Sequence, residues 1–240
     1  MWNAMGASVR GPEHSRTGLP NQDAWLRRIT KGANLVVVCD GLGSRPQSAT
    51  GSRAACLAVA DAVRYWVAQP KVPPEMLLRL VHSLWNMRVH ATGRDVCATT
   101  CLFAVVTKDE RLLLAQLGDG LVMLKTPQGD TILEPPSDRF GNTTTGLGIA
   151  ANVREWRFHF EPHFTGPASI LLATDGVADD LLPEKRADFL TFLTNQYGKQ
   201  PAPQRSHAIA NQLRAWPTPK HLDDKTVAVL WNDAPMEDTL

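Results

Sequence analysis

The chain has 240 residues, 43% of them hydrophobic, and its 25 basic and 24 acidic side chains give a formal net charge of +1. This near-neutral charge argues against a surface built to bind nucleic acid or an anionic membrane. The sequence contains no apolar run of the ~18 residues that a membrane span needs. Its N-terminal residues lack the apolar core of a signal peptide, so we expect a cytoplasmic protein.

The composition also predicts how the chain is divided. No proline- or serine-rich linker interrupts the sequence, so we expect residues 1–240 to form a single domain. The four cysteines are expected to be buried and reduced. On one strand face, Cys97 and Cys101 would lie about 13 Å apart, too far for a disulfide. The spacing of the cysteines and histidines matches no zinc-site pattern.

The N-terminal part of the chain alternates between apolar and polar segments. Trp2–Val9 is expected to form a first strand, although its alternation is weak. The polar segment Gly11–Ala24 contains His14 and is either a solvated hairpin or a loop that serves a functional site. Leu35–Cys39 is a short, β-branched apolar run, which is typical of a buried strand.

Two helices are expected next. The first lies near Ser52–Ala68 and carries an apolar stripe at helical spacing. The second follows the chain break at Pro73 and Pro74. Both stripes are interpreted as surfaces that pack on a core rather than as cofactor sites.

Three strands follow in quick succession: Ala98–Thr107, Arg111–Leu117 and Leu121–Thr126. Because the connections between them are short, we expect each strand to pair antiparallel with the next. Pro135–Gly148 is a loop rich in glycine and threonine. It lacks the lysine of a phosphate-binding P-loop, so a nucleotide site is not favoured there.

The C-terminal part completes the expected elements. Strands are predicted at Glu155–Phe160 and Ala168–Thr174, helices at Lys185–Tyr197 and Ser206–Trp216, and a last strand at Thr226–Trp231. Strands and paired helices follow each other in groups rather than in regular alternation. This order predicts an α+β fold and not a parallel βαβ fold.

Three of the expected strands end in the same dipeptide, Asp-Gly. The acids at these ends are Asp40, Asp119 and Asp175. A carboxylate at the mouth of a buried strand is costly unless its charge is stabilised. We therefore expect these acids to converge on a bound cation.

Further acids extend the candidate site. The complete set of possible ligands is Asp40, Asp119, Asp175, Asp179 and Asp223, with Asp23 as a neighbouring acid. Oxygen-only sites suit Mg²⁺ or Mn²⁺ better than zinc. These residue types indicate metal-assisted hydrolysis with water as the nucleophile.

Six short motifs, taken in order, resemble the metal-dependent serine/threonine protein phosphatases of type 2C, in a compact bacterial form. The motifs are NQDAW at Asn21–Trp25, VVVCDGLGS at Val36–Ser44, ATTCL at Ala98–Leu102, LGDG at Leu117–Gly120, ATDGVAD at Ala173–Asp179 and DDKTVAVLW at Asp223–Trp231. Each motif is modest alone, and their order and spacing make the resemblance specific. It implies a four-layer α-β-β-α sandwich, in which two central antiparallel sheets are flanked by helices.

The resemblance also implies roles for individual residues. Asp40 would bridge two Mn²⁺ or Mg²⁺ ions, the Gly41 carbonyl would bind one of them, and Asp175 and Asp223 would complete the pair. Asp119 and Asp179 would join Asp175 around a third ion. The catalytic residue Asp23 would orient a bridging hydroxide for in-line attack on phosphorus. Thr99 and Thr100 occupy positions whose role is mostly structural.

The sequence departs from the family pattern at several positions. Gly18 stands where the family often has an arginine that grips the phosphate, and Arg16 is the nearby candidate for substrate binding. Gln22 stands where some members have a glutamate that reaches a metal through water. Leu42 occupies the slot of the eukaryotic general-acid histidine, and His14 is a candidate replacement.

The leading hypothesis is therefore a phosphoserine/phosphothreonine protein phosphatase that acts in signalling. Its partners would be phosphorylated proteins and a separate cognate kinase. One alternative keeps the metal chemistry and acts on a small phosphomonoester. The other is a pseudophosphatase that binds phosphoproteins without turnover.

Overall fold

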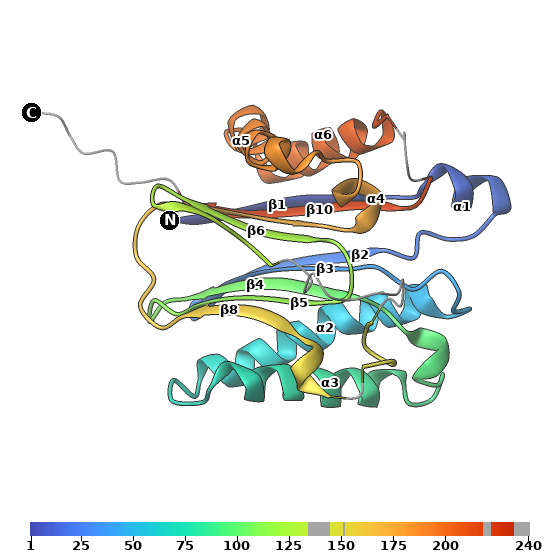
Figure 1. Cartoon of the computed structure of the whole chain (residues 1–240), viewed down its shortest axis with the longest axis horizontal. Coiled ribbons are helices and arrows are strands. Elements are labelled where there is room, and N and C mark those ends of the chain that lie inside the picture. Colours follow the sequence, from blue (N-terminus) through green and yellow to red (C-terminus); the bar gives the residue numbers. More distant parts are fainter. Residues whose placement is uncertain (134–144, 151, 218–221, 233–240) are drawn as a thin grey trace, which may run out of the picture.

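Two antiparallel β-sheets pack face to face at the centre of the structure, with helices on both outer faces (Figure 1). The computed structural model describes residues 1–133, 145–150, 152–217 and 222–232. The first sheet has the spatial order β1 (Trp2–Val9), β10 (Lys225–Asn232), β9 (Ala168–Ala173), β6 (Leu121–Thr126), β7 (Gly129–Ile132). The second has the order β2 (Ala24–Ile29), β3 (Ala33–Cys39), β4 (Cys101–Thr107), β5 (Leu112–Leu117), β8 (Arg157–Glu161).

The helices form the two outer layers. α2 (Ser48–Val67) and α3 (Pro74–Val89) cover the second sheet, and α5 (Arg186–Tyr197) and α6 (Ala202–Arg214) cover the first (Figure 1). Two short helices, α1 (Pro12–Thr17) and α4 (Asp175–Ala178), lie near one end of the sheets. Short 3-10 turns span Asp95–Cys97, Val153–Glu155 and Pro183–Lys185. The predicted four-layer α-β-β-α sandwich is confirmed.

Strand β3 explains why an uninterrupted apolar run suits this fold. Leu35 and Val37 pack toward the helices, whereas Val36 and Val38 pack between the two sheets. Because both faces of the strand are buried, an alternating polar pattern would be destabilising there. Burial of each valine contributes about 1.5–3 kcal/mol relative to an exposed side chain.

The expected pairing of β5 with β6 is wrong. β5 pairs with β4 and β8 in the second sheet, whereas β6 pairs with β7 and β9 in the first. The connecting residues 118–120 cross from one sheet to the other. Gly118 and Gly120 have φ angles of 93° and 112°, which favour glycine. Three extended residues can span about 10 Å, which is the spacing of packed sheets.

The polar segment Gly11–Ala24 contains the short helix α1, which the sequence analysis did not predict. Pro12 begins the helix, and Gly18 ends it in the left-handed conformation with φ 76°. This combination of an N-terminal proline and a C-terminal glycine is a recognised helix signature. Helix α2 begins four residues before the expected start at Ser52, and α6 begins at Ala202 rather than Ser206.

The cysteines agree with the prediction of reduced thiols. All four are buried and free. Cys39 on β3 and Cys56 on α2 face each other, with their sulfur atoms 3.8 Å apart. Among the described residues, none of the helices combines the length and hydropathy needed to cross a lipid bilayer.

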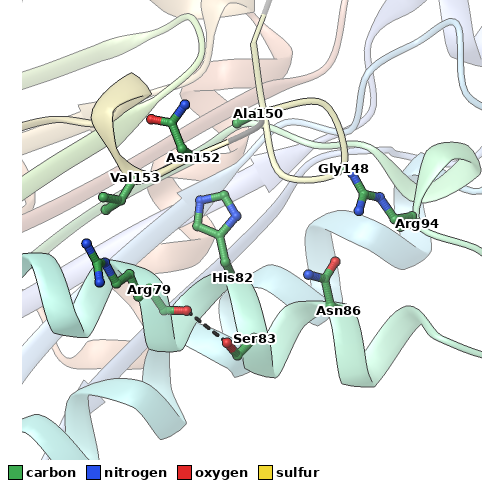
Figure 2. A pocket seen from close by; sticks show the side chains of 9 residues that line it. All are labelled: Arg79, His82, Ser83, Asn86, Arg94, Gly148, Ala150, Asn152 and Val153. Atoms are coloured by element: carbon green, nitrogen blue, oxygen red, sulfur yellow. Dashed lines mark hydrogen bonds between the residues drawn. The ribbon is translucent and has the colours of Figure 1, made fainter.

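A polar cavity of about 400 Å³ lies beside α3, beneath the second sheet (Figure 2). Its other wall is formed by Gly148, Ala150, Asn152 and Val153. Most of the loop predicted at Pro135–Gly148 lies outside the described residues.

Candidate active site

The strand register places the acidic strand ends of the first sheet together. Ala173 pairs with both Leu121 and Val227, so the segments that adjoin these residues meet at one end of the sheet. Asp175 follows β9 and is the first residue of α4. Asp119 lies on the crossover into β6, and Asp223 precedes β10.

The second sheet brings Asp40 to the same end of the sandwich. Cys101 pairs with Leu117, and Val38 pairs with Leu102, so the ends of β3 and β5 are level with each other. Asp40 directly follows β3. Strand ends that carry Asp40 and Asp175 therefore lie at the same end of the sandwich.

Asp23 joins the two sheets at this end. Its side chain is buried, and its Oδ2 accepts hydrogen bonds from Thr174 Oγ1 at 2.9 Å and Thr226 Oγ1 at 2.7 Å. Burial raises the pKa of Asp23 to about 8, and the charges of Asp224 and Asp175 add to this effect. The two threonine hydroxyls act in the opposite direction, because they stabilise the carboxylate.

The backbone of Asp40 is held by two threonines. The Asp40 carbonyl accepts hydrogen bonds from Thr99 Oγ1 and Thr100 N, both at 2.8 Å, and its N–H donates to Thr100 Oγ1 at 2.9 Å. These contacts give Thr99 and Thr100 the structural role that the family resemblance implies. They also fix the direction in which the strand presents its terminal carboxylate.

The electrostatics of Asp40 show that several acids surround it. Burial raises the pKa of Asp40 well above its usual range. The negative charges of Asp23, Asp175 and Asp223 raise it further. Four carboxyl groups therefore gather around one point, which is called the aspartate cluster below: Asp23, Asp40, Asp175 and Asp223.

Gly41 is required at its position by packing. A Cβ atom there would lie 2.7–2.8 Å from the backbone and Cβ of Ser48, at the start of α2. The Gly41 N–H donates to the Gln22 carbonyl at 3.2 Å. Helix α2 thus packs directly against the residue whose carbonyl is the expected metal ligand.

Asp175 and Asp223 are less buried than Asp23. The Gly176 N–H donates to Asp175 Oδ1 at 2.6 Å, and the Asp224 N–H donates to Asp223 Oδ1 at 2.7 Å. A Cβ atom on Gly176 would lie 2.1 Å from the Asp224 carbonyl oxygen. This glycine therefore allows α4 to pack on the segment that carries Asp223.

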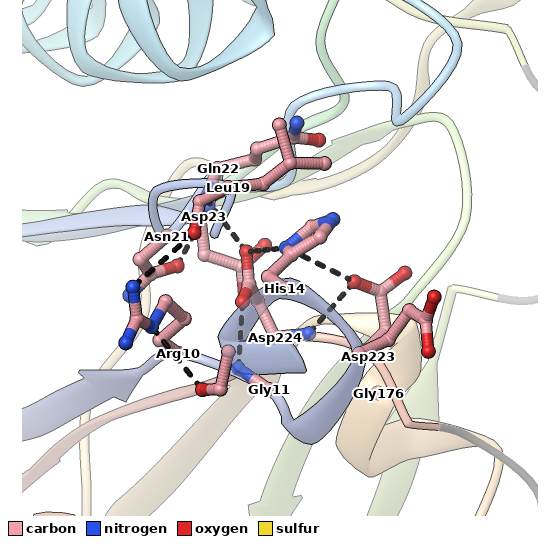
Figure 3. Close-up of polar contacts among 12 residues, drawn as sticks. Arg10, Gly11, His14, Leu19, Asn21, Gln22, Asp23, Gly176, Asp223 and Asp224 are labelled. Carbon is pink, nitrogen blue, oxygen red and sulfur yellow. Dashed lines mark hydrogen bonds and ion pairs between the residues drawn. The ribbon is translucent and has the colours of Figure 1, made fainter. Parts of the chain in front are cut away.

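Asp224 is a residue whose role the sequence analysis missed. Its buried carboxylate accepts hydrogen bonds from Gly11 N at 2.7 Å, Gln22 N at 2.6 Å and His14 Nδ1 at 2.9 Å (Figure 3). It therefore ties α1 and the segment before β2 to the start of β10. The sequence feature that could have indicated this supporting role is the pair Asp223-Asp224, directly before an apolar strand.

His14 lies on the buried face of α1 between the two acids (Figure 3). Its Nδ1 is 2.9 Å from Asp224 Oδ2 and 3.9 Å from Asp223 Oδ1. One ligand atom from each of these three residues lies within 4.8 Å of the others, a grouping that is compatible with a metal. Both oxygens of Asp224 already accept hydrogen bonds, so we assign its carboxylate to the support of α1.

The remaining predicted residues lie toward solvent. Asp119 and Asp179 are exposed, and the Asp179 N–H donates to the Asp175 carbonyl at 3.0 Å. Arg16 forms an ion pair with Glu13 on the exposed face of α1, at 2.6 Å, and its side chain is 73% exposed. Within the described part of the chain, Arg16 forms no hydrogen bond or ion pair with the aspartate cluster.

The donor set of the aspartate cluster fits a hard divalent cation. Carboxylate and carbonyl oxygens are the ligands that Mg²⁺ and Mn²⁺ prefer. The mutual repulsion of the buried acids would be offset by a positive ion. Gln22 Oε1 is buried and has no hydrogen-bond donor among the described residues, which suits a hydrated ion nearby.

Comparisons with known proteins agree with this architecture. The photosystem II phosphatase PBCP has a TM-score of 0.68 and 16% identity, covering 98% of this chain and 100% of that chain. The S. agalactiae serine/threonine phosphatase has a TM-score of 0.67 and 16% identity, covering 97% and 100%. RsbX in complex with magnesium has a TM-score of 0.60 and 14% identity, covering 96% and 94%.

These low identities establish the shared fold alone. Comparison with curated protein sequences finds no match. The family model for protein phosphatase 2C matches residues 10–216, which is most of the chain. The resemblance expected from the six motifs is therefore confirmed, and this chain belongs to the protein phosphatase 2C family.

Proposed function

We propose that this chain is a Mn²⁺- or Mg²⁺-dependent phosphatase that hydrolyses phosphoserine and phosphothreonine in proteins. The observation that supports this most strongly is the aspartate cluster at one end of the sandwich, in a chain of a phosphatase family. The magnesium complex of the structurally similar RsbX is consistent with the proposed cofactor.

The proposed ligands divide into two groups. Asp40, Asp175, Asp223 and the carbonyl oxygen of Gly41 would hold two ions, and Asp119 and Asp179 would join Asp175 around a third. Divalent ions bound there would offset the negative charge of the phosphate and lower the pKa of a water molecule. The threonine contacts to the Asp40 backbone would keep its carboxylate oriented without cost at the moment of reaction.

Asp23 is proposed to orient the attacking water. Two threonine hydroxyls hold its Oδ2. Its side chain also forms a hydrogen bond with that of Asp40, so it would contact a water bound beside Asp40.

His14 is our candidate for the proton donor to the leaving serine or threonine oxygen. Its Nδ1 is engaged by Asp224, so Nε2 is the nitrogen that would donate. The Asp224 carboxylate would fix the orientation of the ring. This arrangement would serve where Leu42 replaces the eukaryotic histidine.

The residue that binds the substrate phosphate and the partner proteins are also proposals. Arg16 would bind the phosphate from the rim of the site after it leaves Glu13. The partners would be phosphorylated cytoplasmic proteins and a separate cognate kinase.

The proposal is tested by phosphate release from a phosphothreonine peptide and from an aryl phosphate, with Mn²⁺, Mg²⁺ or EDTA present. We expect metal-dependent release that falls by at least about a thousandfold in Asp40→Asn and Asp175→Asn. Comparable rates on a phosphotyrosine peptide would contradict the serine/threonine specificity. Release from the aryl phosphate but from no phosphopeptide would favour a small phosphomonoester as the substrate.

A pseudophosphatase would give a different result. It would bind the phosphothreonine peptide while releasing no phosphate under any metal condition. Asp188→Asn, on the exposed side of α5, is the control for the loss of one carboxylate far from the cluster.

A further inference from the structure

An apolar pocket of about 320 Å³ lies between the β2–β3 hairpin and the C-terminal half of α2. Strand β3, with 7 residues, separates the hairpin turn from Asp40. An extended strand of that length spans about 23 Å. The turn lies at the end of the sandwich away from α1 and α4, so the pocket is remote from the aspartate cluster (Figure 1).

The floor of the pocket is apolar. It is lined by Ala33 and Leu35 of β3 and by Ala60, Val63 and Val67 of α2. The first four side chains are buried in the core between the second sheet and its helices, and Val67 is half-buried. An apolar molecule on this floor would be removed from water, which favours binding.

Three cations surround this floor. Arg28 on β2, Lys31 in the turn and Arg64 on α2 line the same pocket, and its described lining residues include no acid. Arg28 is directly opposite Leu35 in the strand pair, and directly paired residues lie on the same face of a sheet. Ala60 and Arg64 are four residues apart, so they are neighbours on one face of α2. The hairpin and the helix therefore both bring positive charge to the apolar floor.

These cations have no acidic partner. Within the described part of the chain, none of the three side chains forms a hydrogen bond or an ion pair, and Arg64 lies over the ring of Tyr65, 5.3 Å from its centroid. The acid on α2, Asp61, is ion-paired with Arg88 of α3. The positive charge at the rim of the pocket is therefore available to an anion.

The neighbouring β4–β5 turn does not reverse this charge. It contacts the hairpin through a hydrogen bond from the Lys108 N–H to the Gly32 carbonyl, at 3.0 Å. Asp109 of this turn is ion-paired with Arg111, at 2.8 Å. Lys108 and Glu110 are both exposed and carry opposite charges.

Local contacts form the hairpin wall of the pocket. Thr30 Oγ1 accepts hydrogen bonds from the Gly32 and Ala33 N–H groups, at 3.2 and 3.0 Å. A Cβ atom on Gly32 would lie 2.9 Å from Val67 Cγ1, so this glycine lets the turn approach α2. The pocket is thus formed in the folded chain before any ligand arrives, which reduces the ordering cost of binding.

We propose that this pocket binds a small amphipathic organic anion, with its apolar body on the floor and its acidic group at the rim. The volume and the mostly apolar lining are those of a small-molecule site. A carboxylate or sulfonate would accept charge-assisted hydrogen bonds from Arg28, Lys31 or Arg64. The proposal is independent of hydrolysis at the aspartate cluster.

The test is a fluorescence titration of the full chain in EDTA with two probes that share one apolar body. The probe 8-anilinonaphthalene-1-sulfonate carries an anionic group, and N-phenyl-1-naphthylamine is the same ring system without it. EDTA removes metal ions that could bind the sulfonate at the aspartate cluster. We expect both probes to bind, and the sulfonate to bind about tenfold more tightly.

Arg28→Gln and Arg64→Gln should each weaken binding of the sulfonate several-fold and leave binding of the uncharged probe unchanged. Val67→Phe should weaken both probes at least about tenfold, because the larger side chain occupies the pocket. Arg79→Gln is the matched control. It removes the same charge from an exposed position on α3 that does not line this pocket, so both affinities should remain those of the wild type.

Thermal unfolding shows whether the variants are folded. Arg28 and Arg64 are exposed, so their variants decide the result even if Val67→Phe does not fold. Failure of both probes to bind the wild-type chain would overturn the proposal, and so would equal affinity of the wild type for the two probes. Wild-type affinity for the sulfonate in both Arg28→Gln and Arg64→Gln, or in folded Val67→Phe, would also overturn it.

Discussion

Asp23 and Arg16 lie in neighbouring segments of the chain but in opposite environments. Asp23 is 5% exposed and is held by threonines from two different elements. Arg16 is exposed on α1 and forms an ion pair with Glu13, a neighbour on the same short helix. Tertiary packing therefore holds Asp23, whereas a local contact that solvent weakens holds Arg16.

This difference predicts how the two regions respond to substitution. Changes around the aspartate cluster should alter stability and activity together, because the same hydrogen bonds support both. Changes on α1 that face solvent should alter substrate binding with little effect on stability. His14 and Asp224 lie at the boundary, because they join α1 to the buried region.

The largest effect on stability is expected for Asp224→Asn. This change replaces one of two oxygens that accept three hydrogen bonds with an amide nitrogen that donates. We expect the free energy of unfolding to fall by about 2–4 kcal/mol, as measured by urea denaturation. Asp188→Asn, on the exposed surface, should change it by less than about 0.5 kcal/mol. A wild-type-like value for Asp224→Asn would show that α1 is not held by this carboxylate.

The pH dependence of the metal-free protein is the next largest effect. The folded state keeps the Asp23 proton up to about pH 8, whereas the usual pKa of an aspartate is 3.8. Between these values the folded state binds more protons than the unfolded state, so stability falls as the pH rises. In EDTA we expect the free energy of unfolding to be higher at pH 5 than at pH 8 by a few kcal/mol.

Added Mg²⁺ should reverse most of that loss at pH 8, because a cation favours the charged carboxylates. Urea denaturation at the two pH values, with and without Mg²⁺, measures both effects. A metal-free protein whose stability increases from pH 5 to pH 8 would contradict the clustering of the acids.

A smaller effect is expected for Thr226→Val. The substitution keeps the shape of the side chain and removes the hydroxyl that hydrogen-bonds to Asp23 Oδ2. Stability should fall by about 1 kcal/mol. The pKa of Asp23 should rise further, which moves the acidic limb of the pH–activity profile to higher pH. Thr194→Val, which removes a hydroxyl bonded to the Leu190 carbonyl within α5, is the control and should leave that profile in place.

The smallest effect on stability is expected on α1. Arg16→Ala should change the free energy of unfolding by less than about 0.5 kcal/mol and raise KM for a phosphothreonine peptide several-fold at nearly constant kcat. Glu13→Gln should lower KM, because it releases Arg16 from its ion pair. If both variants have the wild-type KM, Arg16 does not bind the phosphate.

Much of the fold followed from local patterns. Continuous apolar runs such as Leu35–Cys39 marked strands buried on both faces, and apolar stripes near Ser52–Ala68 and after Pro73 marked the helices that cover them. The acids at strand ends were equally visible, because a carboxylate after a buried run is costly without a partner. Their convergence was predicted from this cost and from the order of the motifs.

Other features depended on contacts between distant segments. The pairing partner of β6 could not be read from its short connection to β5, because a three-residue segment can either turn back or cross to a second sheet. The support given by Asp224 depends on Gly11, His14 and Gln22, which lie more than 200 residues away in the chain. Local propensity carries no information about such pairs.

The sequence by itself determined the α+β class, the buried strands and the acids that end them, because burial and charge leave local patterns. The tertiary structure alone decided which sheet each strand joins, which acid supports α1 and where the polar cavity beside α3 lies. These outcomes depend on the register and spacing of elements that are remote in the chain. Their energies arise only when the two sheets and their helices pack together.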